Sequence, residues 1–315
     1  MFESLKNAEH VLIASHENPD PDAVGSLLCA NLILKKMAVN AFLYLPDMPS
    51  GSLNFLPNFF EIKNEIPKDS SFDILLALDY SDYARLRIPE NLSFQKKITI
   101  DHHRGNQKSE IKIIDLEASS TCEIIYWLMK KEGIEIDKEM ALCLLSGIVA
   151  DTGGFSHIST SSNTLKATSD LLSKGISLSR ISKHIFLTGP VFSMQSAGVL
   201  GKILSRIKVI PGCDLAYSWV SFEDIQKNNL QDLKLNGISS IISKESKCLY
   251  ALLLVEYEKG KIKGSLRSEP FKSTQKKKVD CIARELGGGG HPYAAGFKQE
   301  GTINEVLEKV INVIR

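Results

Sequence analysis

Neither charge sign dominates this chain of 315 residues, because 38 basic and 37 acidic side chains leave a formal net charge of only +1. Proteins that hold long nucleic acids or anionic membranes usually present a strong positive field, so the balance disfavours both partners. No apolar run approaches the length of a membrane span, and residues 1–6 begin no signal-peptide pattern. We therefore expect a cytoplasmic protein that has no membrane partner.

The cysteines lack the spacing of a zinc site or a redox pair. The chain contains six cysteines and no Cys-x-x-Cys, and several of them lie within apolar helix or strand patterns. Cysteines of this kind behave as small buried hydrophobic residues in a reducing compartment. They are Cys29, Cys122, Cys143, Cys213, Cys248 and Cys281.

Short apolar runs alternate with helical patterns between residues 11 and 114, which predicts an α/β domain with a mostly parallel, doubly wound sheet. Asp22 is expected to cap a helix that ends near residue 37, and further helices are expected at 120–131 and 138–150. The strands should be buried on both faces, because their runs are apolar throughout. The expected strands cover residues 11–14, 41–45, 74–78 and 98–100.

A second series of strand and helix patterns begins after Pro211-Gly212 and predicts a smaller C-terminal α/β domain. The chain is long enough, and with 43% hydrophobic residues apolar enough, for each of two domains to bury a core. Short amphipathic helices, broken at Gly189-Pro190, separate the two series. We predict domains over 1–188 and 205–315, joined by a helical linker over 189–204.

Acidic and imidazole side chains form four clusters in the first half of the chain, and all but the last follow directly after an apolar run. Because ligands of parallel α/β sheets bind at the ends of the strands, we expect these clusters to converge. Oxygen and imidazole ligands without a thiolate favour Mn²⁺ or Mg²⁺ over a cysteine-rich zinc site. The clusters are His16, Asp20 and Asp22; Asp79; Asp101, His102 and His103; and Asp151.

Taken one at a time, these residues also have ordinary structural interpretations. Asp20 and Asp22 suit a turn and a helix N-cap about as well as a metal site, and Asp79 alone is typical of a turn. The sequence Asp101-His102-His103 is more specific, because crowding these groups at a strand end is costly without a metal or an anion. Asp151 closes a predicted helix, where a carboxylate opposes the helix dipole and needs a compensating cation.

Together the clusters predict a reaction. They offer enough ligands for two hard divalent cations, and two such ions about 3.5–4 Å apart would activate a bridging water. The same pair of ions would hold both the attacking and the leaving oxygen of a phosphate ester in line. Phosphoester hydrolysis is therefore the expected chemistry.

In this order the clusters resemble the motifs of the DHH phosphoesterases, and the resemblance spans nearly the whole chain. It rests on residues 16–26 (His-Glu-Asn-Pro-Asp-Pro-Asp-Ala-Val-Gly-Ser), 78–82 (Leu-Asp-Tyr-Ser-Asp), the name-giving 101–103, and 151–155 (Asp-Thr-Gly-Gly-Phe). No one of these clusters is decisive alone, whereas all four in the family's order are. The resemblance implies a pair of Mn²⁺ ions, with Mg²⁺ or Co²⁺ as alternatives.

The resemblance also implies a role for each residue. His16 and Asp20 are implied to bind one Mn²⁺, and Asp79 is implied to bridge both ions. The second imidazole, His103, is implied to contact the scissile phosphate. Asp101 is implied to support His103 without itself contacting the metal. The ligands of the other Mn²⁺ are implied to be Asp22, His102 and Asp151.

A glycine-rich run in the C-terminal half has the features of an anion site. Four consecutive glycines, 287–290, expose backbone N–H groups that can approach an anion closely. A flexible loop is the alternative, but the run resembles the substrate-binding loop of the DHHA1 domain. Arg267 stands at a predicted strand end, where its guanidinium suits a terminal phosphate or, equally, a surface ion pair. The expected substrate-binding residues are Arg267, Ser268, Gly288, Gly289, Gly290 and His291.

Within the family, a DHH domain followed directly by DHHA1 resembles the bifunctional group of enzymes that degrade nanoRNA and 3′-phosphoadenosine-5′-phosphate (pAp). The implied activity is Mn²⁺-dependent hydrolysis of short oligoribonucleotides to mononucleotides and of pAp to AMP. The implied partners are short RNAs and phosphorylated nucleotides. The residues leave the oligomeric state open, with a homodimer among the alternatives.

Four other functions stay open. The first is a phosphodiesterase for linear or cyclic dinucleotides such as pApA or pGpG. A RecJ-type single-strand exonuclease is disfavoured, because the chain has no room for a further oligonucleotide-binding domain. The glycine-rich run disfavours an inorganic pyrophosphatase. A non-catalytic nucleotide-binding protein is disfavoured because every ligand position is occupied by a competent side chain.

Overall fold

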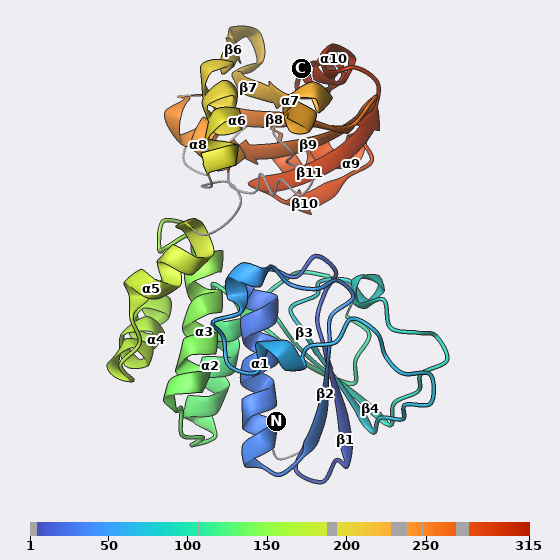
Figure 1. Cartoon of the computed structure of the whole chain (residues 1–315), viewed down its shortest axis with the longest axis vertical. Coiled ribbons are helices and arrows are strands. Elements are labelled where there is room, and N and C mark those ends of the chain that lie inside the picture. The colour runs from blue at the N-terminus through green and yellow to red at the C-terminus, as the bar shows by residue number, and fades with distance from the viewer. Residues whose placement is uncertain (1–4, 106, 188–193, 228–237, 247, 269–276) are drawn as a thin grey trace. The chain divides into compact units, whose positions relative to one another are not determined.

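The computed structural model describes residues 5–105, 107–187, 194–227, 238–246, 248–268 and 277–315. It divides into two compact units, Met1–Leu187 and Thr188–Arg315 (Figure 1). Each unit contains one sheet and its own helices, so the predicted two-domain α/β class is confirmed. Among the described residues, no helix is both long and apolar enough to cross a membrane.

The first unit is built on a five-stranded sheet in which every neighbouring pair is parallel. The strand order β2-β1-β3-β4-β5 places β1, β3 and β4 at the centre. Their carboxyl ends therefore share one edge of the sheet, which is where open α/β sheets bind ligands. The strands are β1 His10–Ala14, β2 Asn40–Tyr44, β3 Ile74–Leu78, β4 Lys96–Asp101 and β5 Ile111–Ile114.

The carboxyl-terminal parts of the central strands are buried because both faces of the sheet are covered. Successive side chains of a strand point to opposite faces. In β1, Val11 and Ile13 join the larger core beneath the helices, while Leu12 and Ala14 join a smaller core on the other face. That second core is closed by side chains from the connections between strands, including Tyr80 and Leu86.

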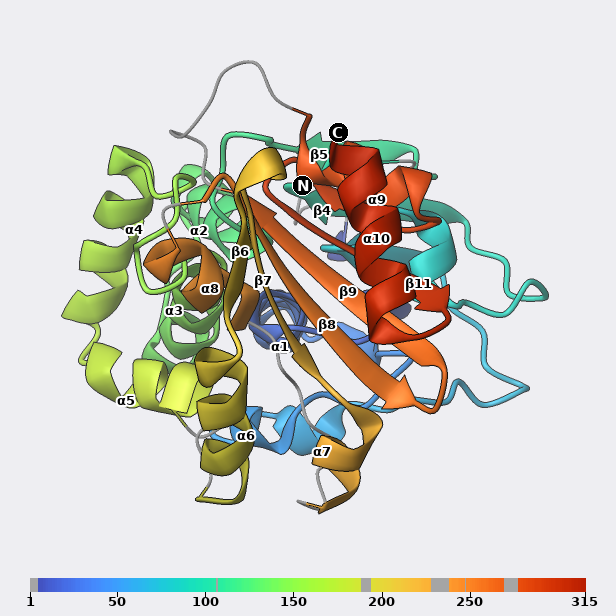
Figure 2. The same ribbon diagram turned by 90° about the horizontal axis from the view of Figure 1, so that it is seen from above.

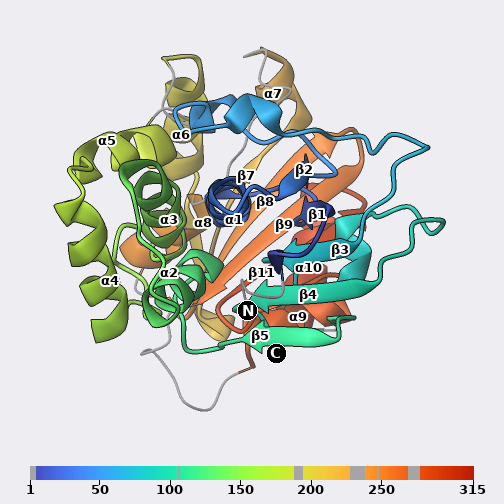
Figure 3. The ribbon, with the colours of Figure 1, turned by 90° about the horizontal axis from the view of Figure 1, so that it is seen from below.

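The helices of the first unit gather on one side of its sheet (Figure 3). Helices α1 and α3 pack closely, because Gly25 of α1 and Gly147 of α3 have no side chain at the contact. A Cβ atom on Gly25 would lie 2.5 Å from the carbonyl oxygen of Cys143. The helices are α1 Pro21–Lys36, α2 Thr121–Lys131, α3 Lys138–Asp151, α4 Ser162–Ser173 and α5 Leu178–Ser182, followed by the π-helix η5 Lys183–Leu187.

The start of α1 corrects one prediction. Asp20, not Asp22, is the N-cap, and its carboxylate accepts hydrogen bonds from the backbone N–H groups of Asp22 and Ala23. The physical reason is Pro21, which lacks an N–H and has a helical φ, so it occupies the first helical position and leaves the cap to the preceding residue. Asp22 is consequently inside the helix, with a fully buried side chain.

The second unit contains a mixed six-stranded sheet in the order β10-β11-β9-β8-β7-β6, in which only β7 and β8 are parallel. Helices α9 and α10 cover one face and α6, α7 and α8 pack on the other. Figure 2 shows α10 lying over the sheet. The elements are β6 Lys208–Ile210, β7 Leu215–Val220, β8 Tyr250–Glu258, β9 Lys261–Ser268, β10 Gly289–His291, β11 Ala294–Glu300, α6 Met194–Ser205, α7 Phe222–Lys227, α8 Ile238–Glu245, α9 Val279–Glu285 and α10 Ile303–Ile314.

Part of the glycine-rich run, which was expected to be a substrate-binding loop, forms a strand. Residues Gly289–His291 form the edge strand β10, which pairs antiparallel with β11. Glycine permits this tight hairpin, since a Cβ atom on Gly288 would lie only 2.1 Å from the carbonyl oxygen of Gly296. Gly290 also has a φ of +141°, which side chains disfavour. Part of the backbone of the glycine-rich run therefore forms one strand of the hairpin.

The exact division of the chain stays a prediction. Of the expected linker 189–204, residues 189–193 lie outside the described residues, and α6 occupies all of the remainder as part of the second unit. Five of the six cysteines are buried, as their apolar surroundings in the sequence indicated.

Candidate metal centre

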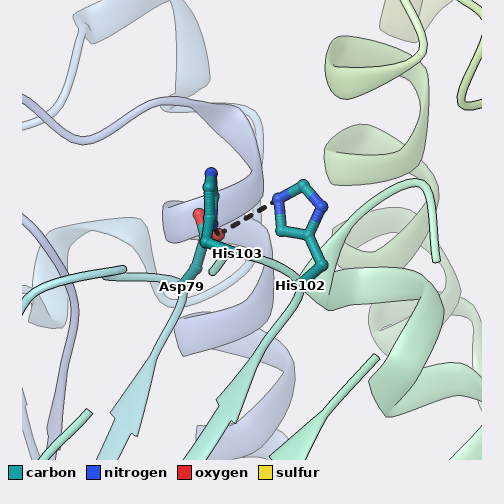
Figure 4. A group of neighbouring side chains, drawn as sticks. All are labelled: Asp79, His102 and His103. Carbon is teal, nitrogen blue, oxygen red and sulfur yellow. Dashed lines mark ion pairs between the residues drawn. The ribbon is translucent and has the colours of Figure 1, made fainter. Parts of the chain in front are cut away.

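Three strand ends bring the acidic and imidazole clusters together. His16 follows β1, Asp79 follows β3, and the sequence from Asp101 to His103 ends β4. Figure 4 shows Asp79 and the two imidazoles close together at the ends of their neighbouring strands. The predicted convergence of ligands at the carboxyl edge of the sheet is therefore seen in the first unit.

Asp79 has a left-handed backbone conformation, with a φ of +52°, and Ser81 follows with a φ of +55°. This conformation is unfavourable for most residues, although aspartate tolerates it better than most. It is held by two hydrogen bonds: the N–H of Asp79 donates to the Ile100 carbonyl at 3.0 Å, and the Ser15 hydroxyl donates to the Asp79 carbonyl at 3.2 Å. The turn directs the buried Asp79 carboxylate toward the neighbouring imidazoles.

One group of ligands consists of His16, Asp20 and Asp79. The Nε2 atom of His16 lies 3.7 Å from both Asp20 Oδ2 and Asp79 Oδ2, which is too long for hydrogen bonds. Its Nδ1 atom contacts the Glu17 carbonyl oxygen at 2.7 Å and the Arg85 guanidinium at 3.0 Å. Because the shorter contact is to an acceptor, we assign the proton to Nδ1, which leaves the Nε2 lone pair directed at the two carboxylates.

A second group consists of Asp22, His102 and Asp151. His102 Nε2 lies 3.3 Å from Asp151 Oδ2, at the last residue of α3. Asp22 is held by the N-terminus of α2, where the backbone N–H groups of Thr121 and Cys122 donate to its carboxylate at 2.7 Å and 3.0 Å. Three elements that are distant in the sequence thus each supply one ligand.

Asp79 connects the two groups. Its Oδ2 atom faces His16, while its Oδ1 atom lies 3.5 Å from His102 Nε2. The same Oδ1 atom lies 3.3 Å from His103 Nδ1 and accepts a hydrogen bond from the Thr121 hydroxyl at 3.1 Å. A carboxylate that directs one oxygen to each group has the geometry of a bridging ligand.

Asp101 is tied to its surroundings by hydrogen bonds and is not part of either group. Its carboxylate accepts from the His103 backbone N–H at 3.0 Å, from the Ser81 N–H at 2.8 Å and from the Gln107 amide at 3.2 Å. It also contacts His103 Nδ1 at 2.9 Å. Burial raises the pKa of Asp101, but the contacts with His103 and the other donors outweigh burial and lower it to about 2.

The electrostatics of the site fit divalent cations. Burial and the neighbouring carboxylates raise the pKa of Asp22 well above its usual value, and burial raises that of Asp151 to about 6. Burial lowers the pKa of His102, yet Asp151 and Asp79 raise it to about 9. Its Nε2 is buried and is among the few such atoms in the described residues without a hydrogen-bond partner. A cation among these groups would compensate the carboxylates and give this nitrogen a ligand bond.

Comparison with models of known protein families identifies the family of this chain. The model of the DHH family N-terminal domain matches residues 10–148, and the model of the DHHA1 domain matches residues 214–315. Together these matches cover well over half of the chain. The chain belongs to the DHH family. Its first unit therefore contains the DHH domain, and its second unit contains the DHHA1 domain.

Individual proteins resemble this DHH family member along most of its length. It is 28% identical to a Thermus thermophilus protein named bifunctional oligoribonuclease and PAP phosphatase NrnA, over 99% of this chain and 92% of that protein. It is 23% identical to a probable manganese-dependent inorganic pyrophosphatase of Streptococcus mutans, over 69% of this chain and 72% of that protein. An exopolyphosphatase-related protein from Bacteroides fragilis matches with a TM-score of 0.87 and 26% identity, over 99% of this chain and 94% of that chain.

In the DHHA1 domain, the expected substrate-binding residues lie on neighbouring strands. His291 of β10 pairs with Ala294 of β11, and Ala294 pairs with Arg267 of β9, so His291 and Arg267 share one row and one face. Burial lowers the pKa of Arg267, and no carboxylate in the described part of the chain pairs with its guanidinium. Ser268 donates its N–H to the Tyr293 carbonyl at 3.1 Å. A partly buried guanidinium that has no carboxylate partner among the described residues is suited to an anionic ligand.

Sequence reasoning missed several residues that shape the centre. Thr121 contacts Asp79 and Asp22, Arg85 contacts His16, and Gln107 contacts Asp101. None of them belongs to a charged cluster. Thr121 and Arg85 contact residues that are distant in the sequence, whereas Gln107 lies six residues after Asp101. Gly147 was also missed, although a Cβ atom on it would lie 2.4 Å from Asp22 Oδ1. A glycine in the middle of a predicted helix was the available signal.

Proposed function

We propose that this protein is a metal-dependent phosphoesterase that hydrolyses short oligoribonucleotides to mononucleotides and pAp to AMP. The observation that carries the proposal is the pair of ligand groups that Asp79 connects at the end of β3. The name of the Thermus relative, which matches over nearly its whole length, supports the choice of substrates. A cytoplasmic location is a further prediction of the same account, which leaves the oligomeric state open, with a homodimer among the alternatives.

The cofactor that suits these ligands is a pair of Mn²⁺ ions, with Mg²⁺ or Co²⁺ as alternatives. His16 and Asp20 would hold one ion, and Asp79 would contribute one oxygen to each. Bound side by side, two such cations lower the pKa of a water and stabilise the charge on both oxygens of the ester. The ligands of the other ion would be Asp22, His102 and Asp151. The name of the manganese-dependent relative supports the choice of metal.

His103 and Asp101 act on the substrate rather than on the metal in this proposal. The ring of His103 lies against that of His102, with centroids 4.1 Å apart, and Asp101 holds Nδ1 of His103 at 2.9 Å. An imidazole fixed in this way beside the ligand groups can donate to an oxygen of the scissile phosphate. Asp101 fixes the orientation of the His103 ring and is therefore a positioning residue.

The DHHA1 domain supplies the substrate clamp. Arg267 presents a planar fork of donors that suits the oxygens of a phosphate. We assign Ser268 and the segment from Gly288 to His291 to the same clamp, because β10 and β9 place His291 and Arg267 on one face. A short strand with a terminal phosphate meets this description better than a long one, since the chain as a whole carries no excess of positive charge.

The test is Mn²⁺-dependent turnover of 5′-labelled RNAs from two to about 24 nucleotides, a range that exceeds the footprint of a small binding fold. We expect the shortest RNAs to be hydrolysed fastest, pAp to release phosphate, and EDTA to abolish both reactions. Inorganic pyrophosphate is measured in parallel, because one relative is named as a pyrophosphatase. Pyrophosphate or long RNA as the best substrate would contradict the proposal. Exclusive turnover of pApA, pGpG or their cyclic forms would also contradict it.

Two matched variants separate catalysis from folding. Asp79→Asn keeps the shape of the side chain and should lower turnover at least about 100-fold, because it removes the charge of the bridging ligand. Asp115→Asn is the control: Asp115 follows strand β5 of the same sheet and belongs to neither ligand group. Equal loss of turnover in both variants would show that the effect is not specific to the centre.

A further inference from the structure

One face of the DHHA1 sheet carries no apolar core over β9 and β11. On the face covered by α9 and α10, side chains such as Ile262, Leu266 and Phe297 are buried in the core. The core on the opposite face takes its strand residues from β7 and β8 and none from β9 or β11. Alternate residues of β9, namely Lys263, Ser265 and Arg267, point to that opposite face.

Two lysines lie directly opposite each other on this face. Lys263 of β9 pairs with Lys298 of β11, and both side chains are exposed. Like charges at paired positions destabilise a sheet. Within the described residues, neither lysine has a carboxylate partner in an ion pair. Such a pair is suited to an anion that bridges both ammonium groups.

An aromatic ring lies beside the lysine pair. Tyr257 is the residue at the irregularity between β8 and β9, where the register shifts between Glu256 and Glu258. Its side chain is 42% exposed, and Lys298 Nζ lies 5.9 Å from the ring centroid. A tyrosine ring beside cations is the combination that binds bases and phosphates of single strands.

The lysine pair continues the row of the substrate clamp. Lys263 and Arg267 are four residues apart on the same face of β9, which corresponds to about 13 Å along the strand. On the neighbouring strand β11, Ala294 lies opposite Arg267 and Gly296 lies between the two positions, and both residues are small. A phosphate bound at Arg267 is therefore too far away to contact Lys263, whereas a later phosphate of the same strand can reach it.

The positively charged surface formed by Arg267, Lys263 and Lys298 extends only a short distance along the strands. In the next row along the strands, Lys261 pairs with Glu300, and Lys261 Nζ lies 2.8 Å from Glu258 Oε2. Acidic groups thus neutralise the surface directly beyond Lys263 and Lys298. Counted over the described residues, the surface therefore has positive charge for only a few phosphates.

We propose that Tyr257, Lys263 and Lys298 form a subsite for the nucleotides of an oligoribonucleotide beyond the one held by Arg267. The lysines bind a backbone phosphate, and the tyrosine ring stacks on a base. This inference rests on the proposed function and deepens it, because it assigns the preference for RNA of several nucleotides over a single nucleotide to three residues outside the metal centre.

The test compares substrate lengths in the double variant Lys263→Gln/Lys298→Gln. For a five-nucleotide RNA we expect kcat/KM to fall about tenfold. Turnover of pAp, which has one nucleotide, should change less than twofold. The slope of log KM against log salt concentration should decrease by about 0.7 for the five-nucleotide RNA, because the two lysines together bind one phosphate and about 0.7 counterion is released per phosphate contact of a single strand. Lys309→Gln, on α10 at the opposite face, removes the same kind of charge and is the matched control.

A second variant tests stacking separately from charge. Tyr257→Ala should raise the KM for the five-nucleotide RNA severalfold, and Tyr257→Phe should restore it, because phenylalanine also stacks. A loss that is equal for pAp and the five-nucleotide RNA, or a loss shared by Lys309→Gln, would overturn the subsite.

Binding distinguishes this inference from the proposed function. The affinity of a fluorescent five-nucleotide RNA is measured by anisotropy in EDTA, where no turnover occurs. Weaker binding by the lysine double variant supports the subsite, even if the parent protein hydrolyses none of the substrates. Equal binding by the parent and the double variant overturns the subsite, whatever the turnover measurements show.

Discussion

Asp79 shows how far a single backbone position determines the centre. Its left-handed conformation, with a φ of +52°, turns the chain at the end of β3 and allows one carboxylate to face both ligand groups. Such a conformation costs a non-glycine residue roughly 1–2 kcal/mol, which hydrogen bonds from Ser15 and to Ile100 offset. An apolar strand followed by aspartate marked the position in the sequence, but nothing in the sequence indicated the turn.

Gly147 gives a test at the same scale. In Gly147→Ala the new methyl group would lie 2.4 Å from Asp22 Oδ1, so the carboxylate must move. We expect Mn²⁺ affinity, measured by titration calorimetry, to fall at least about tenfold, and stability to fall by about 1–3 kcal/mol.

A glycine elsewhere provides the control for that experiment. Gly201 lies in α6 with nothing within 4 Å of its Cβ position. Gly201→Ala should stabilise the protein by about 0.5–1 kcal/mol, since alanine favours helix, and should leave Mn²⁺ affinity unchanged. Undiminished Mn²⁺ affinity in Gly147→Ala would mean that Asp22 does not hold the ion.

At the scale of elements, the N-terminus of α2 completes the site. Its first two N–H groups bind Asp22, and the Thr121 hydroxyl binds Asp79. Thr121→Val keeps the branched shape and removes only that hydroxyl, so we expect Mn²⁺ affinity to fall about tenfold. Thr121→Ser keeps the donor and should bind Mn²⁺ like the parent. The account is contradicted if both variants bind equally well.

The acidic residue at the start of α7 connects elements of the second unit. Asp224 is buried and accepts hydrogen bonds from Lys202, at 2.7 Å, and from Arg206, both on the segment that includes α6. Burial raises the pKa of Asp224, but these donors outweigh burial and hold it well below the usual value. A depressed folded-state pKa stabilises the fold above the unfolded pKa, and this contribution is lost as the pH falls through the folded pKa.

Asp224→Asn should therefore destabilise the second unit by about 1–3 kcal/mol at pH 7. The difference from the parent should shrink below about pH 4, near the unfolded pKa of aspartate. Unfolding is followed by Trp219 fluorescence in a Trp127→Phe background, because these are the two tryptophans of the chain. A difference that is independent of pH would contradict the electrostatic explanation.

Sequence patterns predicted elements better than their ends. The apolar runs gave β1, β3 and β4, and Ser120 and Asp137 gave the starts of α2 and α3. The patterns gave Asp22 as the cap of α1 because they did not weigh Pro21, and they gave a loop where β10 forms because glycines carry no strand signal. Contacts such as Thr121 with Asp79 join positions 42 residues apart and depend on packing that no local pattern records.

At the scale of the whole molecule, the two units should respond differently to metal. Every residue of the ligand groups lies in the first unit. Mn²⁺ at about 100 times its dissociation constant should stabilise that unit by about 3 kcal/mol, because the ion binds only the folded site. Trp127, on α2, reports on this unit in a Trp219→Phe background. Failure of Mn²⁺ to raise the unfolding midpoint seen by Trp127 would contradict the location of the site.

The most direct measurement is anomalous diffraction at the manganese edge from crystals soaked in Mn²⁺. The account predicts two peaks about 3.5–4 Å apart. One should lie among His16, Asp20 and Asp79, and the other among Asp22, His102 and Asp151 with Asp79 between them. A single peak, or peaks away from these side chains, would contradict the account of two ions that share Asp79.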